Sequence, residues 1–388
     1  MKPDEFEQSP SGKCIRTLRE YCAFVPNPLP PTIEYSPELI KLLSDADRLI
    51  GELSGTGRVL KNPYLLISPY IRREAVSSSK IEGTQSSLSD LFFYEATDKI
   101  TPQAPDVKEV YNYVQAMKQG LRLIAELPIS TRLICELHKT LMKDVRGEHG
   151  TPGELRRSQN WIGPPGCTLN EATYVPPPVD EMNEALSSWE KYINSDPGEP
   201  LLIQAALMHY QFEAIHPFID GNGRIGRVLL NIFFHNSGAL CQPLLYLSEF
   251  FEQYRAEYYR LLLSVSQRGA WTEWIKFFLR GVINMSQNAL DNSKKIITLY
   301  DQYSNRIDSD KKAPEIAHRL LNELFLSIMI SISTLSKKWN IAYTSVKHGV
   351  KSLEMLGIMK EISGKPRNKL YVSEDLLKII LPNNKTKT

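Results

Sequence analysis

Hydrophobic residues recur at helical spacing along most of the chain. After Ser36 and Pro37, an N-cap residue and a proline suited to a first turn, one apolar face repeats every three or four positions. The same spacing predicts helices over about 70–82, 105–127, 129–145, 179–193, 199–214, 247–265 and 271–287, and another after 223. Gly83 is a natural stop for the helix at 70–82. The pattern therefore predicts a mainly α-helical protein.

The helical pattern is interrupted between Thr151 and Pro178. Glycine and proline are frequent in this segment, and short β-prone pieces such as NWIG and TYV stand between them. We expect it to form a β-hairpin flap on the helical body.

The pattern changes again near the C-terminus. Residues 288–312 are rich in Asn, Ser, Asp and Lys and are expected to form a helical or mobile connector. A helix at about 314–330 should follow, then two more in ISTLSKKW and YTSVKHGVKSLEMLG, and two strands in IMKEIS and KLYVS around GKPRN. Three helices and a basic hairpin resemble a small winged helix-turn-helix domain.

The charge is uneven along the chain. The 388 residues carry 46 basic and 44 acidic side chains, and this near-neutral total excludes a protein that coats nucleic acid by bulk charge. The segment from Ala313 to Thr388, however, contains 12 basic and 6 acidic residues. A mildly acidic body with a basic tail domain is therefore expected, and the length suits two or three domains.

Cysteine usage and hydropathy suggest the compartment. The five cysteines are odd in number and form no CxxC pair, which argues against a disulfide framework or a zinc site. The N-terminus has no apolar core, and the most apolar stretch, 228–247, contains Asn, His and Gln. We expect a cytoplasmic protein without a membrane segment.

The most informative residues are 216–227, HPFIDGNGRIGR. Gly221 and Gly223 allow the loop to turn its amides inward as an anion nest, and the next helix starts directly behind it. Arg224 and Arg227 lie three apart on that helix. Taken alone, each feature is more often structural than functional. Together, a base, a carboxylate, two glycines and two cations within twelve residues indicate a polyphosphate site.

This segment resembles the active-site motif of the Fic (filamentation induced by cAMP) family, HPFx[D/E]GNGRxxR, at every defined position. The resemblance implies a Fic-type helical bundle and the transfer of AMP from Mg-ATP to Ser, Thr or Tyr hydroxyls of target proteins. Another phosphate-containing donor, or removal of AMP, stays open. A homodimer is also left open.

The resemblance implies a role for each residue of the motif. His216 would be the general base and Asp220 the magnesium ligand, and Phe218 would be a buried anchor of the loop. Asn222 and the amides of Gly221 and Gly223 would bind the α-phosphate, Arg224 the β-phosphate and Arg227 the γ-phosphate. Ile162 and Gly163 of the flap would dock the target segment by strand addition, and Tyr258 and Tyr259 would approach the adenine.

A second motif is found before the catalytic one. Residues 78–83, SSKIEG, resemble the inhibitory motif [S/T]xxxE[G/N] of the same family, with Ser78, Glu82 and Gly83 at its defined positions. Glu82 lies at the end of a predicted helix, where the helix dipole disfavours an anion. An exposed Glu before a Gly stop is the ordinary alternative. The resemblance implies that Glu82 pairs with Arg227 and competes with the γ-phosphate.

The basic C-terminal region leads to an alternative function. Lys347 and Lys351 would lie on a recognition helix, and Lys365, Arg367 and Lys369 on the wing, within reach of DNA phosphates. Many winged helices instead mediate protein contacts. The alternative to an enzyme is a DNA-binding regulator in which the Fic fold senses ATP or is inactive.

These expectations divide the chain into four parts. Residues 1–104 form an N-terminal helical region with the inhibitory helix, and residues 105–287 form the catalytic domain. Residues 288–312 are the connector, and residues 313–388 form the winged helix-turn-helix domain.

Overall fold

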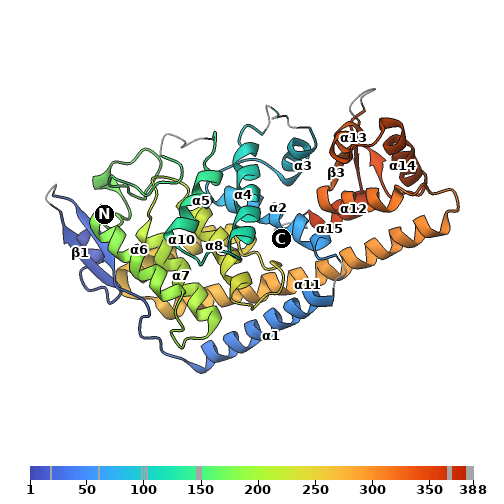
Figure 1. The fold of residues 1–388 in the computed structure, drawn as a ribbon. Helices are drawn as coiled ribbons and strands as arrows, with labels where there is room; N and C mark the ends of the chain where they lie inside the picture. Colours follow the sequence, from blue (N-terminus) through green and yellow to red (C-terminus); the bar gives the residue numbers. More distant parts are fainter. Residues whose placement is uncertain are drawn as a thin grey trace, which may run out of the picture.

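The computed structural model describes residues 1–17, 20–59, 62–97, 99, 101, 104–145, 151–364 and 369–381. Helices dominate this part of the chain, and strands form one two-stranded and one three-stranded antiparallel sheet (Figure 1). The mainly α fold expected from the apolar periodicity is confirmed.

Two long helices lie side by side along one edge of the molecule. α1 (Pro37–Val59) packs along α11 (Trp271–Ser309), and Figure 1 shows the two helices running beneath the others. α11 continues through most of the segment that we expected as a connector. Its buried residues Leu290, Ile296, Leu299, Tyr303 and Ile307 keep helical spacing to the end, which is why the helix does not stop at 287.

The N-terminal helices surround the segment that carries Glu82. α2 (Tyr64–Ile81) is followed by α3 (Leu88–Thr97), α4 (Val107–Leu123) and α5 (Thr131–Leu141). α2 begins earlier than the expected residue 70, because the helix accommodates Pro69 in its interior. α3 was not predicted at all.

The central helices hold the motif loop, residues 216–221, between them. After the short 3-10 helix η3 (Leu169–Glu171) come α6 (Val179–Ile193), α7 (Leu201–Ile215) and α8 (Asn222–Asn236). α7 is buried almost all round, as expected for the middle of a core. α9 (Ser248–Gln253) and α10 (Arg255–Arg268) replace the single helix predicted at 247–265, because the backbone breaks at Tyr254.

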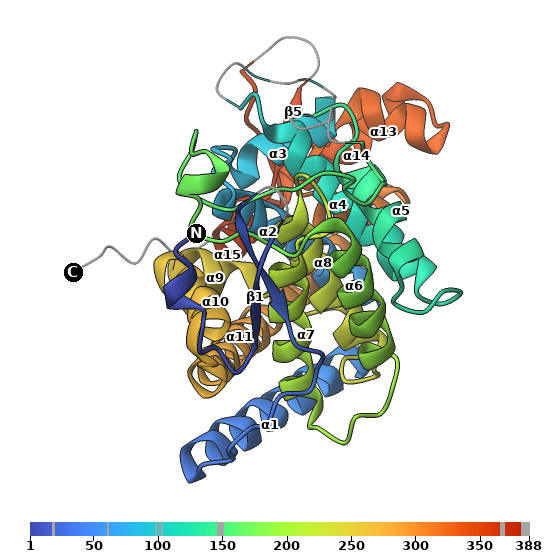
Figure 2. The ribbon, with the colours of Figure 1, turned by 90° about the vertical axis from the view of Figure 1, so that its left-hand side faces the viewer.

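A β-hairpin at the N-terminus covers α6 and α7 (Figure 2). After the 3-10 turn η1 (Pro3–Glu5), β1 (Gly12–Arg16) pairs with β2 (Cys22–Pro26), from Gly12 opposite Pro26 to Arg16 opposite Cys22. The sequence analysis did not find this hairpin. Its strands, GKCIR and CAFVP, do not alternate polar and apolar residues, so the usual signal is absent.

The chain ends in a C-terminal module, which we define as residues 317–380. Its order is α12 (Ala317–Ser327), β3 (Met329–Ser331), α13 (Ile332–Trp339), α14 (Tyr343–Met355), β4 (Lys360–Glu361), β5 (Leu370–Val372) and α15 (Glu374–Ile380). The sheet has the order β3-β5-β4. The predicted helix at 314–330 is therefore wrong at its end, where Ile328 takes a positive φ of 62° and the chain turns into β3.

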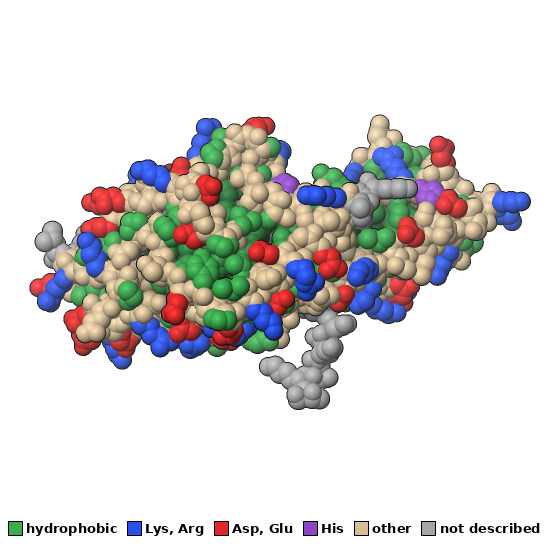
Figure 3. All heavy atoms as spheres, turned by 90° about the horizontal axis from the view of Figure 1, so that it is seen from below, with side chains coloured by type: hydrophobic (Ala, Val, Ile, Leu, Met, Phe, Trp, Pro, Cys, Tyr) green, Lys and Arg blue, Asp and Glu red, His purple; other side chains and the backbone are tan. Residues whose placement is uncertain are grey.

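The surface agrees with the near-neutral composition. Seen from below, acidic and basic side chains are mixed along the margins of the face, and hydrophobic side chains gather toward its middle (Figure 3). Within the described ranges, none of the helices is both long and apolar enough to cross a membrane.

Candidate active site

The motif loop joins two core helices with an unusual backbone. α7 ends at Ile215, and His216 has the left-handed conformation φ 51°, ψ 60°, which is uncommon for a residue with a side chain. Gly221, with φ 81°, then caps the start of α8 at Asn222. The loop 216–221 thus turns back on itself directly in front of the positive end of a helix.

The two ring nitrogens of His216 have different surroundings. Nδ1 lies 3.1 Å from the Glu213 carbonyl oxygen, which can only accept, so Nδ1 carries the proton. Nε2 keeps its lone pair, and no hydrogen bond from the described residues reaches it. Burial lowers the pKa of His216 to about 4, so the ring is neutral near pH 7 and can accept a proton at Nε2.

The Asn222 side chain shapes the loop rather than facing a ligand. Its oxygen accepts a hydrogen bond from the Phe218 amide at 2.8 Å, and its nitrogen donates to the Phe218 carbonyl at 2.8 Å. The phosphate contact expected for this amide stays a prediction, and in the structure both of its polar atoms bond the Phe218 backbone. The donors left for an anion are the backbone amides at the start of α8.

Three residues that the sequence analysis missed hold the loop from outside. Arg156 Nε donates to the His216 carbonyl at 3.0 Å, and Asn160 Nδ2 donates to the Phe218 carbonyl at 2.8 Å. His138 lies flat on the fully buried Phe218 ring, with centroids 3.8 Å apart, and its Nε2 donates to the Asp220 carbonyl at 3.0 Å. Arg156 and Asn160 belong to the RRSQNWIG segment, which the sequence flagged only as a flap. No sequence signal marked His138.

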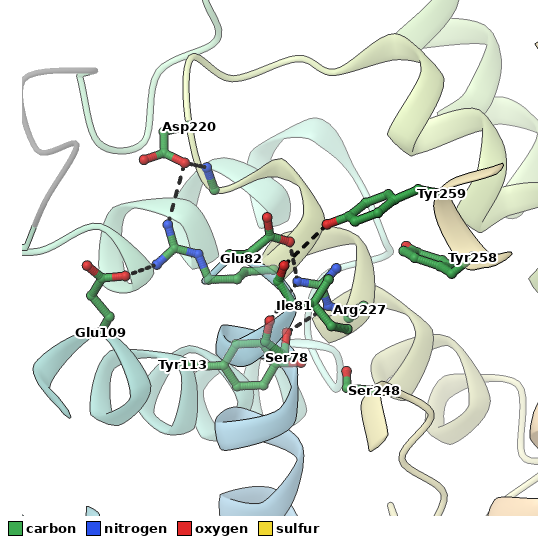
Figure 4. A network of polar contacts seen from close by, with 12 residues as sticks. Ser78, Ile81, Glu82, Glu109, Tyr113, Asp220, Arg227, Ser248, Tyr258 and Tyr259 are labelled. Atoms are coloured by element: carbon green, nitrogen blue, oxygen red, sulfur yellow. Dashed lines mark hydrogen bonds and ion pairs between the residues drawn. The ribbon is translucent and has the colours of Figure 1, made fainter. Parts of the chain in front are cut away.

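The two motif arginines are buried and lead to different partners. Arg224 lies 3.1 Å from Glu109 of α4 and 3.6 Å from Asp220. Arg227 is 1% exposed and points toward the end of α2 (Figure 4). A buried guanidinium is stable only with hydrogen-bonded or charged partners, so both positions require acceptors beside them, and an anion is the strongest of these.

Glu82 supplies that anion for Arg227. Arg227 Nη2 lies 2.6 Å from Glu82 Oε1 and 3.0 Å from the Ser78 carbonyl oxygen, while Nε donates to the Ser78 hydroxyl at 2.8 Å (Figure 4). Burial alone would raise the pKa of Glu82, but the Arg227 charge outweighs it and holds that pKa below its usual value. The predicted Glu82–Arg227 contact is therefore present.

Glycines leave room for this contact. A Cβ on Gly223 would lie 2.4 Å from Glu82 Oε1, so only glycine lets the carboxylate reach the start of α8. Gly83 has a φ of 95° and ends α2 directly after Glu82. Both glycines thus place one carboxylate where the phosphate nest is expected.

The two tyrosines of α10 have different surroundings. Tyr258 is 1% exposed, stacks on Phe251 and hydrogen-bonds His209 Nε2 at 2.8 Å, so it is part of the core. Tyr259 is 41% exposed, and its hydroxyl reaches the Ile81 carbonyl at 3.4 Å, next to Glu82 (Figure 4). Tyr259 is thus the more exposed of the pair and contacts the segment beside Glu82, and the expected approach of both tyrosines to an adenine stays a prediction.

The flap contains a single β-bridge, between Ile162 and Tyr174. Ile162 donates to the Tyr174 carbonyl at 2.8 Å and accepts from the Thr173 and Tyr174 amides. A Cβ on Gly163 would lie 2.6 Å from Cys167 Sγ, so the chain passes closely there. The backbone N–H and C=O of Ile162 therefore both point toward the segment of Tyr174. Because these groups alternate in direction along an extended strand, the N–H and C=O groups of the residues on either side of Ile162 point to the opposite edge.

The residues at the loop fit one divalent cation. Asp220 is half-exposed, and its Oδ1 accepts from the Gly221 amide at 2.6 Å. Within the described ranges, no three His, Cys, Asp or Glu side chains gather into a metal cage. A single carboxylate beside a phosphate nest suits Mg²⁺, which prefers one or two carboxylates together with phosphate oxygens and water.

The basic residues of the C-terminal module lie away from this site. Lys347 and Lys351 are exposed on α14, and Lys369 lies 3.8 Å from Glu361. Lys365 and Arg367 lie outside the described residues.

Comparisons with known families match the two helical segments that build the site. A family described as "Fic/DOC family N-terminal" matches residues 40–122, and one described as "Fic/DOC family" matches residues 128–234. The first contains α2 with Glu82, and the second contains the motif loop.

Two relatives in sequence carry the same family name. "Protein adenylyltransferase Fic" of Drosophila grimshawi is 30% identical over 200 residues, 49% of this chain and 37% of that relative. The Drosophila melanogaster protein of the same name is 29% identical over 36% of its length. The chain thus spans little more than a third of these relatives.

Two bacterial crystal structures share the fold. A Fic family protein from Desulfovibrio desulfuricans G20 has a TM-score of 0.58 at 17% identity, covering 89% of this chain and 98% of that one. A Fic domain-containing signalling protein from Bacteroides thetaiotaomicron has a TM-score of 0.52 at 19% identity, covering 67% and 97%.

Proposed function

The chain belongs to the Fic family, and from this premise we propose that it is a protein adenylyltransferase, which transfers AMP from Mg-ATP to a Ser, Thr or Tyr hydroxyl. The observation that carries the proposal is the neutral His216, with its Nε2 lone pair free, beside the amides that open α8. That arrangement supplies a base next to an anion site.

The reaction is a displacement at the α-phosphorus. The target hydroxyl oxygen forms a bond to that phosphorus, its proton passes to His216 Nε2, and the bond to the bridging oxygen of the β-phosphate breaks. Pyrophosphate leaves, and the target keeps AMP. Little covalent chemistry is asked of the protein, so positioning and charge neutralisation provide the catalysis.

The site residues divide these tasks. The amides around Gly221 and Gly223 hold the α-phosphate at the start of α8, Arg224 the β-phosphate and Arg227 the γ-phosphate. Asp220 holds Mg²⁺, which neutralises phosphate charge when bound. Asn222 acts by fixing the loop through Phe218.

The target protein docks on the flap. An extended segment of the target adds as a strand along the free edge at Ile162 and Gly163, next to His216. The exposed Trp161, at 42%, and Ile162, at 38%, offer apolar contact there.

Glu82 acts as a brake on this activity. Its carboxylate occupies the guanidinium that the γ-phosphate needs, at 2.6 Å. The paired N–H groups of a guanidinium hold a carboxylate or a phosphate, but not both at once. ATP that binds while Glu82 occupies Arg227 therefore lacks a correctly placed α-phosphate.

Glu82→Gly tests the brake. The variant should incorporate at least about tenfold more label from α-labelled ATP into itself, because freeing one charged contact is worth roughly 1.5–3 kcal/mol. Gln85→Gly, an exposed site three residues further along, is the matched control and should behave as wild type. Equal labelling of Glu82→Gly and wild type, with both folded, would refute the brake.

His216→Ala tests the base. In the Glu82→Gly background it should abolish labelling, since the hydroxyl then has no proton acceptor, while ATP binding stays within about twofold because the phosphate contacts remain. Undiminished labelling would remove His216 from this role.

We propose DNA binding by the C-terminal module as a second function. The helix–strand–helix–helix–strand–strand order and the exposed lysines of α14 favour a winged helix that meets DNA phosphates. Duplex binding by anisotropy should weaken steeply with salt, and Lys347→Gln/Lys351→Gln should reduce the salt slope by about two. No binding at low salt would contradict this function.

A further inference from the structure

A polar cleft lies at the junction between the N-terminal helices and the C-terminal module. Its volume is about 570 Å³, and its walls come from α2, α3, α4, α12, β3 and α13. None of the residues proposed for catalysis or for the brake lines it. This volume lies within the range of binding sites for small organic ligands. We call this cavity the junction cleft.

Arg72 brings a buried cation to the junction cleft. It is 5% exposed, its Nε lies 2.6 Å from Glu95 Oε2, and its Nη1 donates to the Ser68 carbonyl at 2.7 Å. From the residues that the structure describes, no hydrogen bond reaches Nη2. Because Arg72 lines the cleft, Nη2 is the guanidinium nitrogen left for a ligand there.

Two lysines reach the same cleft from other elements. Lys338 of α13 lies 2.7 and 2.9 Å from the two oxygens of the buried Glu323, and Lys118 of α4 has no ion-pair partner in the described part of the chain. Desolvation lowers the pKa of Lys118, Arg72 and Lys338 lower it further, and Glu95 opposes them. Three cations thus share two carboxylates, which leaves positive charge and unused donors facing the cavity.

We propose that the junction cleft binds a small anion with two or more phosphate or carboxylate groups, held by Arg72 Nη2, Lys118 and Lys338. The guanidinium provides a directional contact, and the lysines provide positive charges from α4 and α13. Two hydroxyl groups of the wall already have partners, since Thr334 donates to the Ala96 carbonyl at 3.1 Å and Ser331 bonds the Ser333 hydroxyl at 2.9 Å, so the cations carry the site. Such an anion would join α13 of the C-terminal module to α2, the helix whose far end carries Glu82.

Binding to the full-length chain tests the proposal. Isothermal titration with pyrophosphate and, separately, with citrate is run without Mg²⁺ on wild type, Lys118→Gln and Lys338→Gln. Each substitution should weaken the cleft site at least about tenfold, the usual effect of one charge-assisted contact. Lys41→Gln, an exposed lysine on α1, is the control and should bind as wild type. The α8 nest is intact in all four proteins and cannot produce the difference.

The outcomes separate the ligand classes. A loss with both anions supports a general polyanion site, and a loss with pyrophosphate or citrate alone supports phosphate or carboxylate ligands respectively. The proposal is overturned if neither anion binds wild type at millimolar concentration, or if both variants bind as wild type. Thermal melting of each variant confirms that it is folded.

Discussion

At the residue scale, the site depends on a histidine that is neutral at physiological pH. Burial lowers the pKa of His216 to about 4. In the Glu82→Gly background, kcat/KM should therefore stay nearly level from pH 8 to pH 5, where about nine-tenths of the base is still neutral, and fall near pH 4. A half-maximal rate near pH 6.5, the value of an unperturbed histidine, would contradict this assignment.

His138 makes the free energy of unfolding fall as the pH falls, the direction in which the transfer rate should also fall. Burial lowers its folded-state pKa from 6.5 to about 4, so between these values the unfolded chain binds a proton that the folded chain does not. Its contribution is complete above pH 6.5 and is lost as the pH falls toward 4. His138→Gln should reduce the slope of the unfolding free energy by about 1.4 kcal/mol per pH unit in that window, measured by urea titration. An unchanged slope would show that His138 is not buried as a neutral ring.

Arg156 is a positioning residue that has no carboxylate partner among the described residues. Its guanidinium donates to the carbonyls of His216, Ser158 and Pro177, and it is 1% exposed. Arg156→Ala removes a buried donor from these three carbonyls, of which the His216 carbonyl keeps Asn160 at 3.2 Å, and should cost about 2–4 kcal/mol of unfolding free energy and most of the transfer rate. Among the described residues, its neighbour Arg157 pairs with the exposed Glu154 alone, so Arg157→Ala should change stability by less than about 0.5 kcal/mol. Equal effects of the two substitutions would contradict the role of Arg156.

At the element scale, α2 connects the brake to the core. Glu74, near its middle, is 2% exposed and accepts hydrogen bonds from Tyr113 of α4 at 3.2 Å and from the Ser248 hydroxyl of α9 at 2.6 Å. Its carboxylate therefore fixes α2 between two other helices, and the position of Glu82 depends on that anchor.

Glu74→Ala should loosen the brake from a distance. Hydrogen exchange of the amides at 76–82 should accelerate and basal transfer should rise, because the end of α2 is no longer held against Arg227. Lys80→Ala, an exposed change on the same helix, is the control and should do neither. Unchanged exchange at 76–82 in folded Glu74→Ala would refute this coupling.

The sequence predicted the helices whose apolar residues recur at regular spacing, and it missed the elements whose apolar residues do not. The apolar stripes of α1, α6 and α7 were sufficient to place them. The β1–β2 hairpin and α3 carry no comparable pattern, and Pro69 concealed the first turn of α2. The motif residues were found because their types and spacing are distinctive, whereas Arg156, Asn160 and His138 act through backbone carbonyls that no sequence pattern displays.

At the scale of the whole molecule, the C-terminal module shares the core of the rest. One cluster of buried apolar residues runs from Phe6 to Ile380, and the Ser68 hydroxyl of α2 donates to the Leu326 carbonyl of α12 at 2.7 Å. The sequence predicted the module as a separate pattern but not its packing on α2, because contacts between distant segments depend on tertiary structure.

This shared core predicts cooperative unfolding. Calorimetry of the full-length chain should show one thermal transition, since removing the module would expose the apolar surface of α2 and α11. Two well-separated transitions, with the module melting first, would contradict a continuous core.

The central claim is that Glu82 restrains AMP transfer by His216. Intact-mass spectrometry after incubation with Mg-ATP tests it most directly, on wild type, Glu82→Gly and Glu82→Gly/His216→Ala. We predict that Glu82→Gly gains the mass of one AMP or more, that wild type gains little, and that the double variant gains none. A Glu82→Gly protein that gains no AMP, or a double variant that still gains it, would contradict the claim.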